Sequence, residues 1–332
     1  MNFSEEDIRP AQLMLDKQRY MDADRDYLLS RKDEWVEVEC PACGSCDSRF
    51  YGEKLGIAYV KCTQCGTVYT NPRPSQALLH NFYATSQNYG YWNKYIFPAT
   101  EETRRTNIFR PRAEQILDYC ESVSIEKHTL LEIGAGFGTF CEEVTDLGAF
   151  ERIIALEPST DLAETCRTKG LEVIDSPIEE VNEEGIADVI VAFEVIEHLF
   201  SPCNFVQQCL RLLRPSGLLV LTCPNVRGFD IAMLGMSSDT FDHEHLNYFH
   251  TESLPNLLKY CGLEIIDVQT PGQLDADIAR KHVLERVVDL DNQPFLQEVL
   301  IERWEELGQA FQSFLATNQL SSHMWVVARK QL

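Results

Sequence analysis

Four cysteines near the start of the chain stand in two pairs. Cys40 and Cys43 form one C-x-x-C pair, Cys62 and Cys65 form the second, and a glycine follows each pair. This spacing is typical of a structural zinc site, in which four thiolates close the coordination shell of the ion. A redox dithiol or an iron–sulfur cluster is the alternative. The sequence therefore predicts one zinc ion here, and Cys46 is spare under this count.

A second set of ligand-type side chains lies further along the chain. Glu194, Glu197 and His198 are spaced i, i+3 and i+4, so we expect them to project from one side of a helical turn. With His245 they would form a mixed oxygen and nitrogen set that suits Mg²⁺, Mn²⁺ or Zn²⁺. His198, His243 and His245 are also candidate general bases for a hydroxyl proton. The alternative is structural, with the glutamate as a cap and the histidines packed in the core.

A third feature is a glycine loop that follows an apolar run. Gly134, Gly136 and Gly138 occupy every second position between a predicted strand and a predicted helix. Glycine at such places permits positive φ and lets a ligand approach the backbone closely. A dinucleotide site needs its third glycine one residue later than Gly138. Glu157 ends the next predicted strand, where a carboxylate can accept both hydroxyls of a ribose.

Alternating apolar runs and helical patterns must position these groups. We expect strands at Thr129–Ile133, Ile153–Glu157, Glu172–Asp175, Asp188–Phe193, Leu218–Cys223, Leu263–Val268 and Met324–Ala328. Helical patterns occur at Phe140–Leu147, Leu162–Lys169, Phe205–Leu213 and Glu252–Tyr260. Such alternation predicts an α/β fold, a Rossmann-like sheet of seven mostly parallel strands with helices on both faces.

Changes in composition divide the chain into four parts. Pro72 and Pro74 end the cysteine-rich module, and aromatic and arginine residues dominate the stretch before the first strand of the sheet. We expect an N-terminal helical segment (1–36), a zinc ribbon (37–75), a lid and linker (76–128), and the sheet domain (129–330) with a helical insertion (273–317).

The lid and linker also carry side chains that suit an acceptor. Tyr89, Tyr91 and Trp92 are candidates for stacking on a sugar or an aromatic ring. Arg104 and Arg105 are candidates for holding a phosphate or a carboxylate. The alternative is that the aromatic rings pack onto the sheet and the arginines pair with surplus acidic residues.

The glycine loop and the acidic end of the following strand resemble class I S-adenosylmethionine-dependent methyltransferases, over about Arg104 to Ala328. The resemblance implies an antiparallel seventh strand. It also implies a methionine site at Glu132, Gly134, Ala135, Gly136 and Gly138, a ribose site at Glu157, an adenine contact at Ile178, and Phe193 below the sulfonium. Many relatives have an acidic residue where this chain has Pro177, so we expect a backbone contact to the adenine there.

Two narrower resemblances concern the acceptor. The E-x-x-E-H segment resembles the ubiquinone-pathway O-methyltransferases and the small-RNA 2′-O-methyltransferases, in which it binds a divalent metal near the acceptor hydroxyls. His245 precedes Phe249 by the four residues that the RNA group shows. The ribbon ahead of the catalytic domain resembles bacterial methyltransferases that modify sugars, and one group that modifies ribosomal-RNA guanines.

Composition limits the class of partner. The 332 residues carry 29 Lys and Arg against 52 Asp and Glu, a net charge of −23, and 44% of residues are hydrophobic. This charge repels a phosphate backbone, which makes nucleic acid an unlikely partner. No apolar run is long enough to cross a bilayer, and the acidic N-terminus has no signal-peptide pattern. We therefore expect a cytoplasmic chain with reduced thiols and no membrane partner.

These observations together predict a methyltransferase of the class EC 2.1.1. We expect it to use S-adenosyl-L-methionine, a structural Zn²⁺ and Mg²⁺ or Mn²⁺ at the active site. We expect it to O-methylate a hydroxyl of a sugar, nucleotide-sugar, glycan or other small molecule. The first alternative is an RNA methyltransferase whose ribbon grips the substrate. The second is a scaffold that binds the cofactor without turnover.

Overall fold

The computed structural model describes residues 4–331, and a seven-stranded sheet forms its centre. Its strands are β6 (Thr129–Ile133), β7 (Arg152–Leu156), β8 (Glu172–Ile174), β9 (Ala187–Phe193), β10 (Leu213–Pro224), β12 (Leu263–Gln269) and β13 (His323–Lys330). They lie in the order β12-β13-β10-β9-β6-β7-β8. The pairs among β6 to β10 are parallel, whereas β13 runs antiparallel to both β10 and β12. The predicted fold class and the antiparallel last strand are confirmed.

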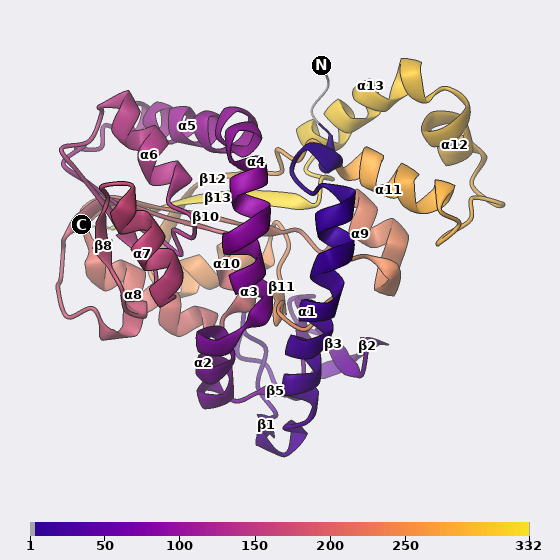
Figure 1. The fold of residues 1–332 in the computed structure, drawn as a ribbon, viewed down its shortest axis with the longest axis horizontal. Helices are drawn as coiled ribbons and strands as arrows, with labels where there is room; N and C mark the ends of the chain where they lie inside the picture. The colour runs from indigo at the N-terminus through magenta and orange to yellow at the C-terminus, as the bar shows by residue number, and fades with distance from the viewer. Residues whose placement is uncertain (1–3, 332) are drawn as a thin grey trace.

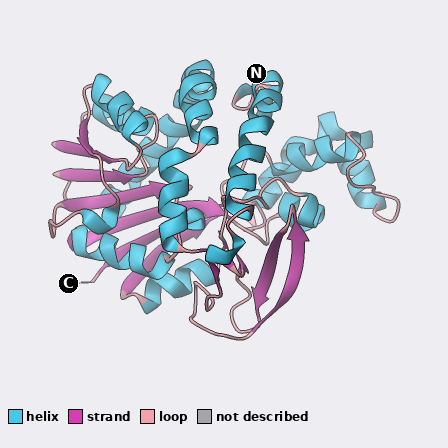
Figure 2. Ribbon diagram, turned by 60° about the horizontal axis from the view of Figure 1, so that its bottom comes forward, coloured by secondary structure: helices cyan, strands magenta, loops and turns pink. Residues whose placement is uncertain are grey.

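Helices cover both faces of this sheet (Figure 1; Figure 2). They include α6 (Thr139–Leu147), α7 (Thr160–Thr168), α8 (Pro202–Leu212) and α10 (Ser253–Tyr260). Side chains alternate between the two faces of a strand, so neighbours in β6 enter different cores. Leu131 belongs to the same buried cluster as Phe205 of α8, and Leu130 to the cluster that holds Phe140 of α6.

The zinc ribbon is a small antiparallel sheet that the sheet domain completes. Its strands are β2 (Ser48–Lys54), β3 (Ile57–Cys62) and β4 (Val68–Thr70), and β11 (Asn247–Tyr248) pairs with β4 at the edge. A second, two-stranded sheet joins β1 (Trp35–Val36) to β5 (Arg73–Pro74). The pairing of β11 means that the ribbon is not a separate module, because it shares hydrogen bonds with the loop that carries His245.

The four predicted zinc ligands lie together at one end of the ribbon. The Sγ atoms of Cys40 and Cys65 are 3.5 Å apart, and those of Cys43 and Cys62 are 3.6 Å apart. All four sulfurs lie within 4.8 Å of one another. A tetrahedral ion with Zn–S bonds of about 2.3 Å spaces its sulfurs at about 3.8 Å, so the cluster is compatible with zinc.

A row of helices leads from the ribbon to the sheet. It comprises α2 (Gln76–Thr85), α3 (Gln87–Tyr91), α4 (Phe97–Arg104) and α5 (Arg110–Ser122), with π-helical turns η3 (Trp92–Ile96) and η4 (Arg105–Phe109) between them. The N-terminal helix α1 (Ala11–Leu29) runs alongside this row (Figure 1). Tyr20 of α1 packs on Tyr91, with ring centroids 4.8 Å apart. We call α3, η3 and α4 the lid helices.

The insertion before the last strand is helical, as predicted. It comprises α11 (Asp275–Leu284), α12 (Pro294–Gln297), η8 (Glu298–Glu302) and α13 (Trp304–Thr317). Its apolar side chains form a small cluster of their own, which includes Ala276, Leu300 and Leu315. Among the described residues, no helix is both long enough and apolar enough to cross a membrane.

Candidate active site

Every predicted site on the sheet lies at the same edge. The glycine loop follows β6, Glu157 follows β7, and Glu194 follows β9, and these three strands are parallel. The antiparallel β13 starts at this edge too, because His323 pairs with Pro224 at the end of β10. In an open α/β sheet, ligands bind beyond the carboxyl ends of the parallel strands. This edge is therefore where a reaction would take place.

The glycine loop has the conformation of a backbone cradle. Gly134, Gly136 and Gly138 all have positive φ, at 72°, 56° and 75°. A Cβ on Gly134 would meet Val195 at 2.7 Å, whereas a Cβ on Gly136 would meet nothing within 4 Å. The backbone of Gly136 therefore faces open space in a conformation that side chains rarely adopt. Ala135, between the first two glycines, is buried.

Glu157 is held beside this cradle. Its carboxylate accepts hydrogen bonds from the backbone N–H of Gly136 at 2.8 Å and of Ser159 at 2.9 Å. Burial raises the pKa of Glu157 to about 7, against the lowering effect of these two bonds. The position fits the predicted ribose contact, because the carboxylate keeps acceptor capacity beside an open loop.

The other predicted cofactor residues line the same region. Glu132 is buried, accepts a bond from Cys141 Sγ at 3.0 Å, and has its pKa raised to about 8 by burial. Ile178 is buried in the cluster that also contains Ile133. Phe193 packs edge-on against Phe140, with ring centroids 4.8 Å apart. Their roles toward a cofactor remain predictions.

The expectation that Glu194 shares a helical face with Glu197 and His198 is wrong. Glu194 has φ of +55°, and the following turn, η6 (Ile196–His198), begins after it. In this left-handed conformation the Glu194 carboxylate contacts side chains of β10 and β13, and it stays near Glu197. There it accepts from Thr222 Oγ1 at 2.7 Å and lies 3.3 Å from His323 Nδ1.

Two residues beside Glu194 were not predicted as part of the site. Arg112 lies 3.8 Å from the Glu194 carboxylate, and its guanidinium covers the Phe193 ring at 4.6 Å. His323 completes the group. Burial opposes ionisation of Glu194, but His323, Arg112 and the Thr222 bond together hold its pKa below the usual value. Arg112 was visible in the arginine-rich stretch, whereas no local motif marks His323.

Glu197, His198 and His245 do come together, as predicted, and we call them the triad. Their ligand-type atoms lie within 4.8 Å of one another, and the two imidazole rings are 4.7 Å apart. Nδ1 of His198 bonds the carbonyl of Glu244 at 3.2 Å, and Nδ1 of His245 bonds the carbonyl of Thr240 at 2.8 Å. A carbonyl only accepts, so each Nδ1 carries the proton and each Nε2 keeps a lone pair.

Burial sets the charge state of the triad. Glu197 is only 1% exposed, and neither of its carboxylate oxygens has a hydrogen-bond partner among the described residues. Burial and the nearby Glu194 raise its pKa well above the usual value. Burial also lowers the pKa of His198 to about 3, which keeps this imidazole neutral. A buried carboxyl group beside two imidazoles, each with its Nδ1 already bonded to a carbonyl, is a donor set for a divalent cation.

A buried polar clamp fixes the triad to the ribbon. Asn247, next to β4, donates through Nδ2 to the carbonyls of Ile196, Glu197 and Leu199. Arg73, at the end of the ribbon, donates to Asn247 Oδ1 at 3.0 Å and is completely buried. The peptide N–H of Leu246 also donates to the carbonyl of Glu197 at 2.8 Å. The ribbon thus helps to position the turn that bears Glu197 and His198.

Two of the predicted acceptor-stacking residues, Tyr91 and Trp92, pack against other side chains of the chain. Tyr91 is buried between Tyr20 and Tyr95, and Trp92 lies between Lys17 of α1 and Arg104. Their predicted role toward an acceptor remains a prediction. Tyr89 lies nearer the triad, because its ring centroid is 5.7 Å from that of Tyr83, whose hydroxyl donates to the carbonyl of His198 at 3.2 Å. Burial raises the pKa of Tyr89.

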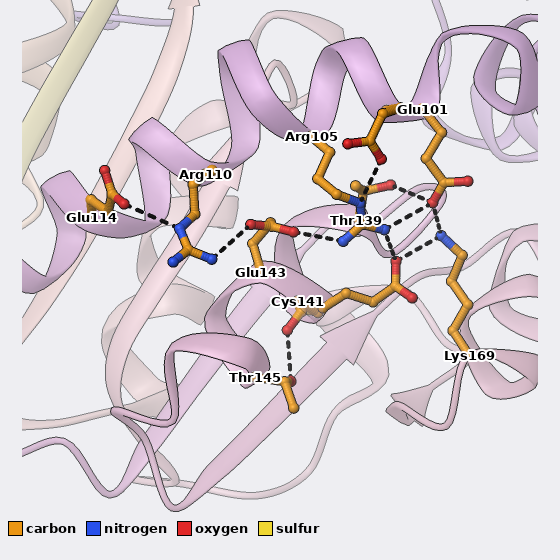
Figure 3. Close-up of polar contacts among 11 residues, drawn as sticks. Glu101, Arg105, Arg110, Glu114, Thr139, Cys141, Glu143, Thr145 and Lys169 are labelled. Carbon is orange, nitrogen blue, oxygen red and sulfur yellow. Dashed lines mark hydrogen bonds and ion pairs between the residues drawn. The ribbon is translucent and has the colours of Figure 1, made fainter.

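The predicted substrate arginines already have partners. Arg104 donates to the carbonyl of Ile8 at 2.8 Å and so ties α4 to the start of α1. Arg105 donates to Glu143 at 2.6 Å, Glu142 at 2.8 Å and Glu101 at 3.2 Å (Figure 3). The alternative stated for these arginines, pairing with acidic residues, describes Arg105, whereas Arg104 bonds a backbone carbonyl and Thr100.

The Arg105 ion pairs form a latch between the lid helices and the glycine loop. Lys169, the residue directly after α7, bridges Glu101 of α4 and Glu142 of α6, and its ammonium also lies 4.1 Å from the centroid of the Phe137 ring. Phe97 of α4 stacks on the same ring at 5.6 Å. Phe137 lies between Gly136 and Gly138, so these contacts hold α4 over the loop. Figure 3 shows the charged side chains meeting between the helices.

A comparison with known protein families shows which family has this arrangement. The model of the methyltransferase domain family matches residues 102–268, about half of the chain. This chain belongs to that family. With its strand order, glycine loop and acidic strand end, it is a class I S-adenosylmethionine-dependent methyltransferase.

Curated relatives match over shorter stretches. A ubiquinone biosynthesis O-methyltransferase of Bradyrhizobium sp. (strain ORS 278) is 33% identical over 114 residues, which are 32% of this chain and 44% of that protein. A probable S-adenosylmethionine-dependent methyltransferase of Mycolicibacterium smegmatis is 31% identical over 146 residues, or 42% and 52% of the two chains. The chain therefore spans about half the length of the curated relatives it matches.

Solved structures resemble this fold at low identity. A SAM-dependent methyltransferase from Archaeoglobus fulgidus is 19% identical, with a TM-score of 0.48 over 71% of this chain and 100% of that one. A putative sarcosine dimethylglycine methyltransferase from Galdieria sulphuraria is 16% identical, with a TM-score of 0.46 over 71% and 88%.

The ionisation of Glu157 should control cofactor affinity. Its folded-state pKa of about 7 means that the carboxylate is charged above pH 7 and becomes neutral below it. A neutral acid accepts ribose hydroxyls more weakly, so the Kd for S-adenosylmethionine should rise as pH falls from 8 to 6. Glu157→Gln should weaken binding about 10- to 100-fold at pH 8 and flatten this dependence. Calorimetric titration measures both effects, with the exposed Glu179→Gln as control. Unchanged affinity in Glu157→Gln would contradict the assignment.

The latch should contribute measurably to stability. Arg105→Ala leaves Glu143, whose side chain is 5% exposed, with only the 3.4 Å contact to Arg110. We expect the free energy of unfolding to fall by about 1–3 kcal/mol, measured by urea denaturation. The control Arg303→Ala removes half-exposed pairs with Glu298 and Glu306 and should cost less than about 1 kcal/mol. Equal losses in the two variants would show that the latch is an ordinary surface cluster.

Proposed function

We propose that this methyltransferase transfers a methyl group to a hydroxyl of a sugar, nucleotide-sugar, glycan or other small molecule. The observation that carries the proposal is the buried Glu197 carboxylate with no hydrogen-bond partner, next to His198 and His245. Such a group is costly to bury unless something charged or protonated meets it. A hydroxyl acceptor must lose a proton during the transfer, so its methylation needs a group that accepts the proton or lowers the hydroxyl pKa. Attack by a neutral amine needs no such group.

At this edge of the sheet, residues on the glycine-loop side bind the cofactor and residues on the triad side meet the acceptor. When bound, S-adenosylmethionine supplies an electrophilic methyl group on a sulfonium. Gly136 and Glu157 would hold the cofactor on the glycine-loop side. Phe193 and Arg112, which stack on each other, form an apolar and cationic surface between that side and β13. Alignment of the acceptor with the methyl group is the largest requirement of an in-line displacement. The latch over Phe137 restricts the motion of α4 and so supports this alignment.

The triad handles the acceptor proton. Glu197 and the Nε2 atoms of His198 and His245 would hold a divalent metal, Mg²⁺ or Mn²⁺, and the carbonyls of Glu244 and Thr240 fix the two rings for that purpose. A metal held there lowers the pKa of a hydroxyl that binds it. Without a metal, an Nε2 lone pair accepts the proton directly, as a general base.

The second candidate, an RNA acceptor, is favoured by a small basic patch. A hollow of about 410 Å³ beside the second zinc knuckle is lined by Arg49, Lys61 and Arg227, with Glu252 at its side. Neither Arg49 nor Lys61 forms an ion pair with another described residue. The patch is local in a chain of net charge −23, whereas RNA binding uses extended positive surfaces. We therefore propose a small-molecule acceptor before RNA. The cytoplasmic fraction of the cells is where we would look for it.

The acceptor class can be read from labelled product. We would incubate the full chain with methyl-labelled S-adenosylmethionine and a size-fractionated extract of the source cells, with and without a mild chelator. Label should appear in the small-molecule or glycan fraction, disappear with chelator, and return with Mg²⁺ or Mn²⁺. Glu197→Gln should reduce this label at least tenfold, while the control Glu179→Gln, at an exposed position, should not.

Three other outcomes would change the proposal. Label in RNA would replace the acceptor and give the ribbon a substrate-gripping role. Label that resists the chelator but is lost in His198→Gln and His245→Gln would assign the proton to a histidine base. Full activity in Glu197→Gln would remove the triad from the reaction.

A further inference from the structure

A second group of ligand-type side chains lies next to the triad and is not used by the proposed reaction. Asp24, His243 and Glu244 have ligand-type atoms that all lie within 4.8 Å of one another. Asp24 comes from α1, whereas the other two residues belong to the loop that also carries His245. An ion with bonds of about 2.0–2.3 Å leaves its donors about 3–4.6 Å apart, so a small contraction would complete the site.

The strongest sign of a ligand is the His243 imidazole. Its side chain is only 2% exposed, and its Nε2 atom has no hydrogen-bond partner among the described residues. The nearest carboxylate, that of Glu244, is 3.7 Å from Nε2, too far for a hydrogen bond. An unpartnered buried nitrogen costs stability unless it meets a ligand. His243 therefore points a donor atom into the group without a contact that explains it.

Charge supports the same conclusion. Asp24, Glu197, Asp242 and Glu244 are all mostly buried, and no Lys or Arg nitrogen of the described chain lies within 4.0 Å of their carboxylates. Lys17 of α1 is the cation that faces Glu244 and Asp242 from beyond this distance. The histidines are the only titratable cations within 4.0 Å of these carboxylates in the described part of the chain, and a divalent ion would balance the remaining charge.

We propose that Asp24, His243 and Glu244 bind a second divalent transition-metal ion. One imidazole with two carboxylates suits a divalent transition metal such as Mn²⁺, Fe²⁺ or Zn²⁺. Each carboxylate also has a neighbour that orients it. Asp24 accepts from the N–H groups of Gln87 and Asn88, both at 3.0 Å, and Glu244 accepts from Asn88 Nδ2 at 2.6 Å.

The ion would join three parts of the molecule. It would tie α1 to the start of α3, which Asp24 already caps, and to the loop of residues 240–246. The carbonyls of Thr240 and Glu244 in that loop orient His245 and His198. The second ion thus has a positioning role, and it does not contact the acceptor.

Metal content of variants tests this proposal separately from the triad. We would saturate the full chain with Mn²⁺, remove free ion by gel filtration, and measure manganese per chain by mass spectrometry. We expect two equivalents in the wild type. One should be lost in His243→Phe and in Asp24→Asn, and the other in Glu197→Gln. Asp26→Asn, on the same helix with a side chain 69% exposed, is the matched control.

His243→Phe keeps the test decisive if Asp24→Asn disturbs the α3 cap. Nε2 of His243 has no partner to lose, and the ring already packs edge-on near Phe82 at 6.0 Å. Crystals soaked in Mn²⁺ should also show an anomalous peak between Asp24 and His243. Manganese content unchanged in both His243→Phe and Asp24→Asn would overturn the second site, whatever happens in Glu197→Gln. Loss confined to Glu197→Gln would leave the triad as the site that binds the ion.

Discussion

The hydrogen bonds that Asn247 and Arg73 make in the interior are the constraint on which the rest of the site depends. Asn247 holds three carbonyls of the turn around Glu197, and Arg73 holds Asn247 while it also bonds the carbonyls of Thr70 and Phe200. A buried guanidinium must satisfy its donors, so this geometry permits little movement. These bonds connect the four-cysteine ribbon directly to the turn that bears Glu197 and His198. The four cysteines fix the ribbon, and the ribbon fixes the turn that bears two of the three triad residues.

Unbalanced buried charge is the second constraint. Most carboxylates of this acidic chain face solvent or pair with arginine, as the latch around Arg105 does between α4 and α6. At the triad edge, by contrast, Glu197 and Glu244 are buried beside histidines and have no guanidinium or ammonium within 4.0 Å. Proteins tolerate this arrangement where protons or metal ions are handled. The same histidine-rich loop serves both groups, with His245 turned to one and His243 to the other.

Local sequence signals predicted what depends on local geometry. Apolar alternation predicted β6 and β9, glycine spacing predicted the cradle at Gly136, and two C-x-x-C pairs predicted the four-cysteine cluster. The joining of His245 to Glu197 and His198 followed from the rule that parallel strands end at one edge.

Long-range pairing was not predictable in this way. The edge contact between β11 and β4 and the approach of His323 to Glu194 join residues far apart in the sequence, with no periodic pattern to mark them. The prediction that Glu194 shares a helical turn with Glu197 and His198 assumed a helix at Glu194, and it failed because Glu194 has a left-handed φ.

Methyl transfer at this edge of the sheet requires the cofactor loop and the triad to face one shared cleft. A crystal structure with S-adenosylhomocysteine, the product left after methyl transfer, tests it most directly. We predict that the ribose hydroxyls bond Glu157, that the adenine lies against Ile178, and that the sulfur lies beside Phe193 on the side that faces Glu197, His198 and His245. A product sulfur directed away from the triad, or a ribose held elsewhere than at Glu157, would contradict the account.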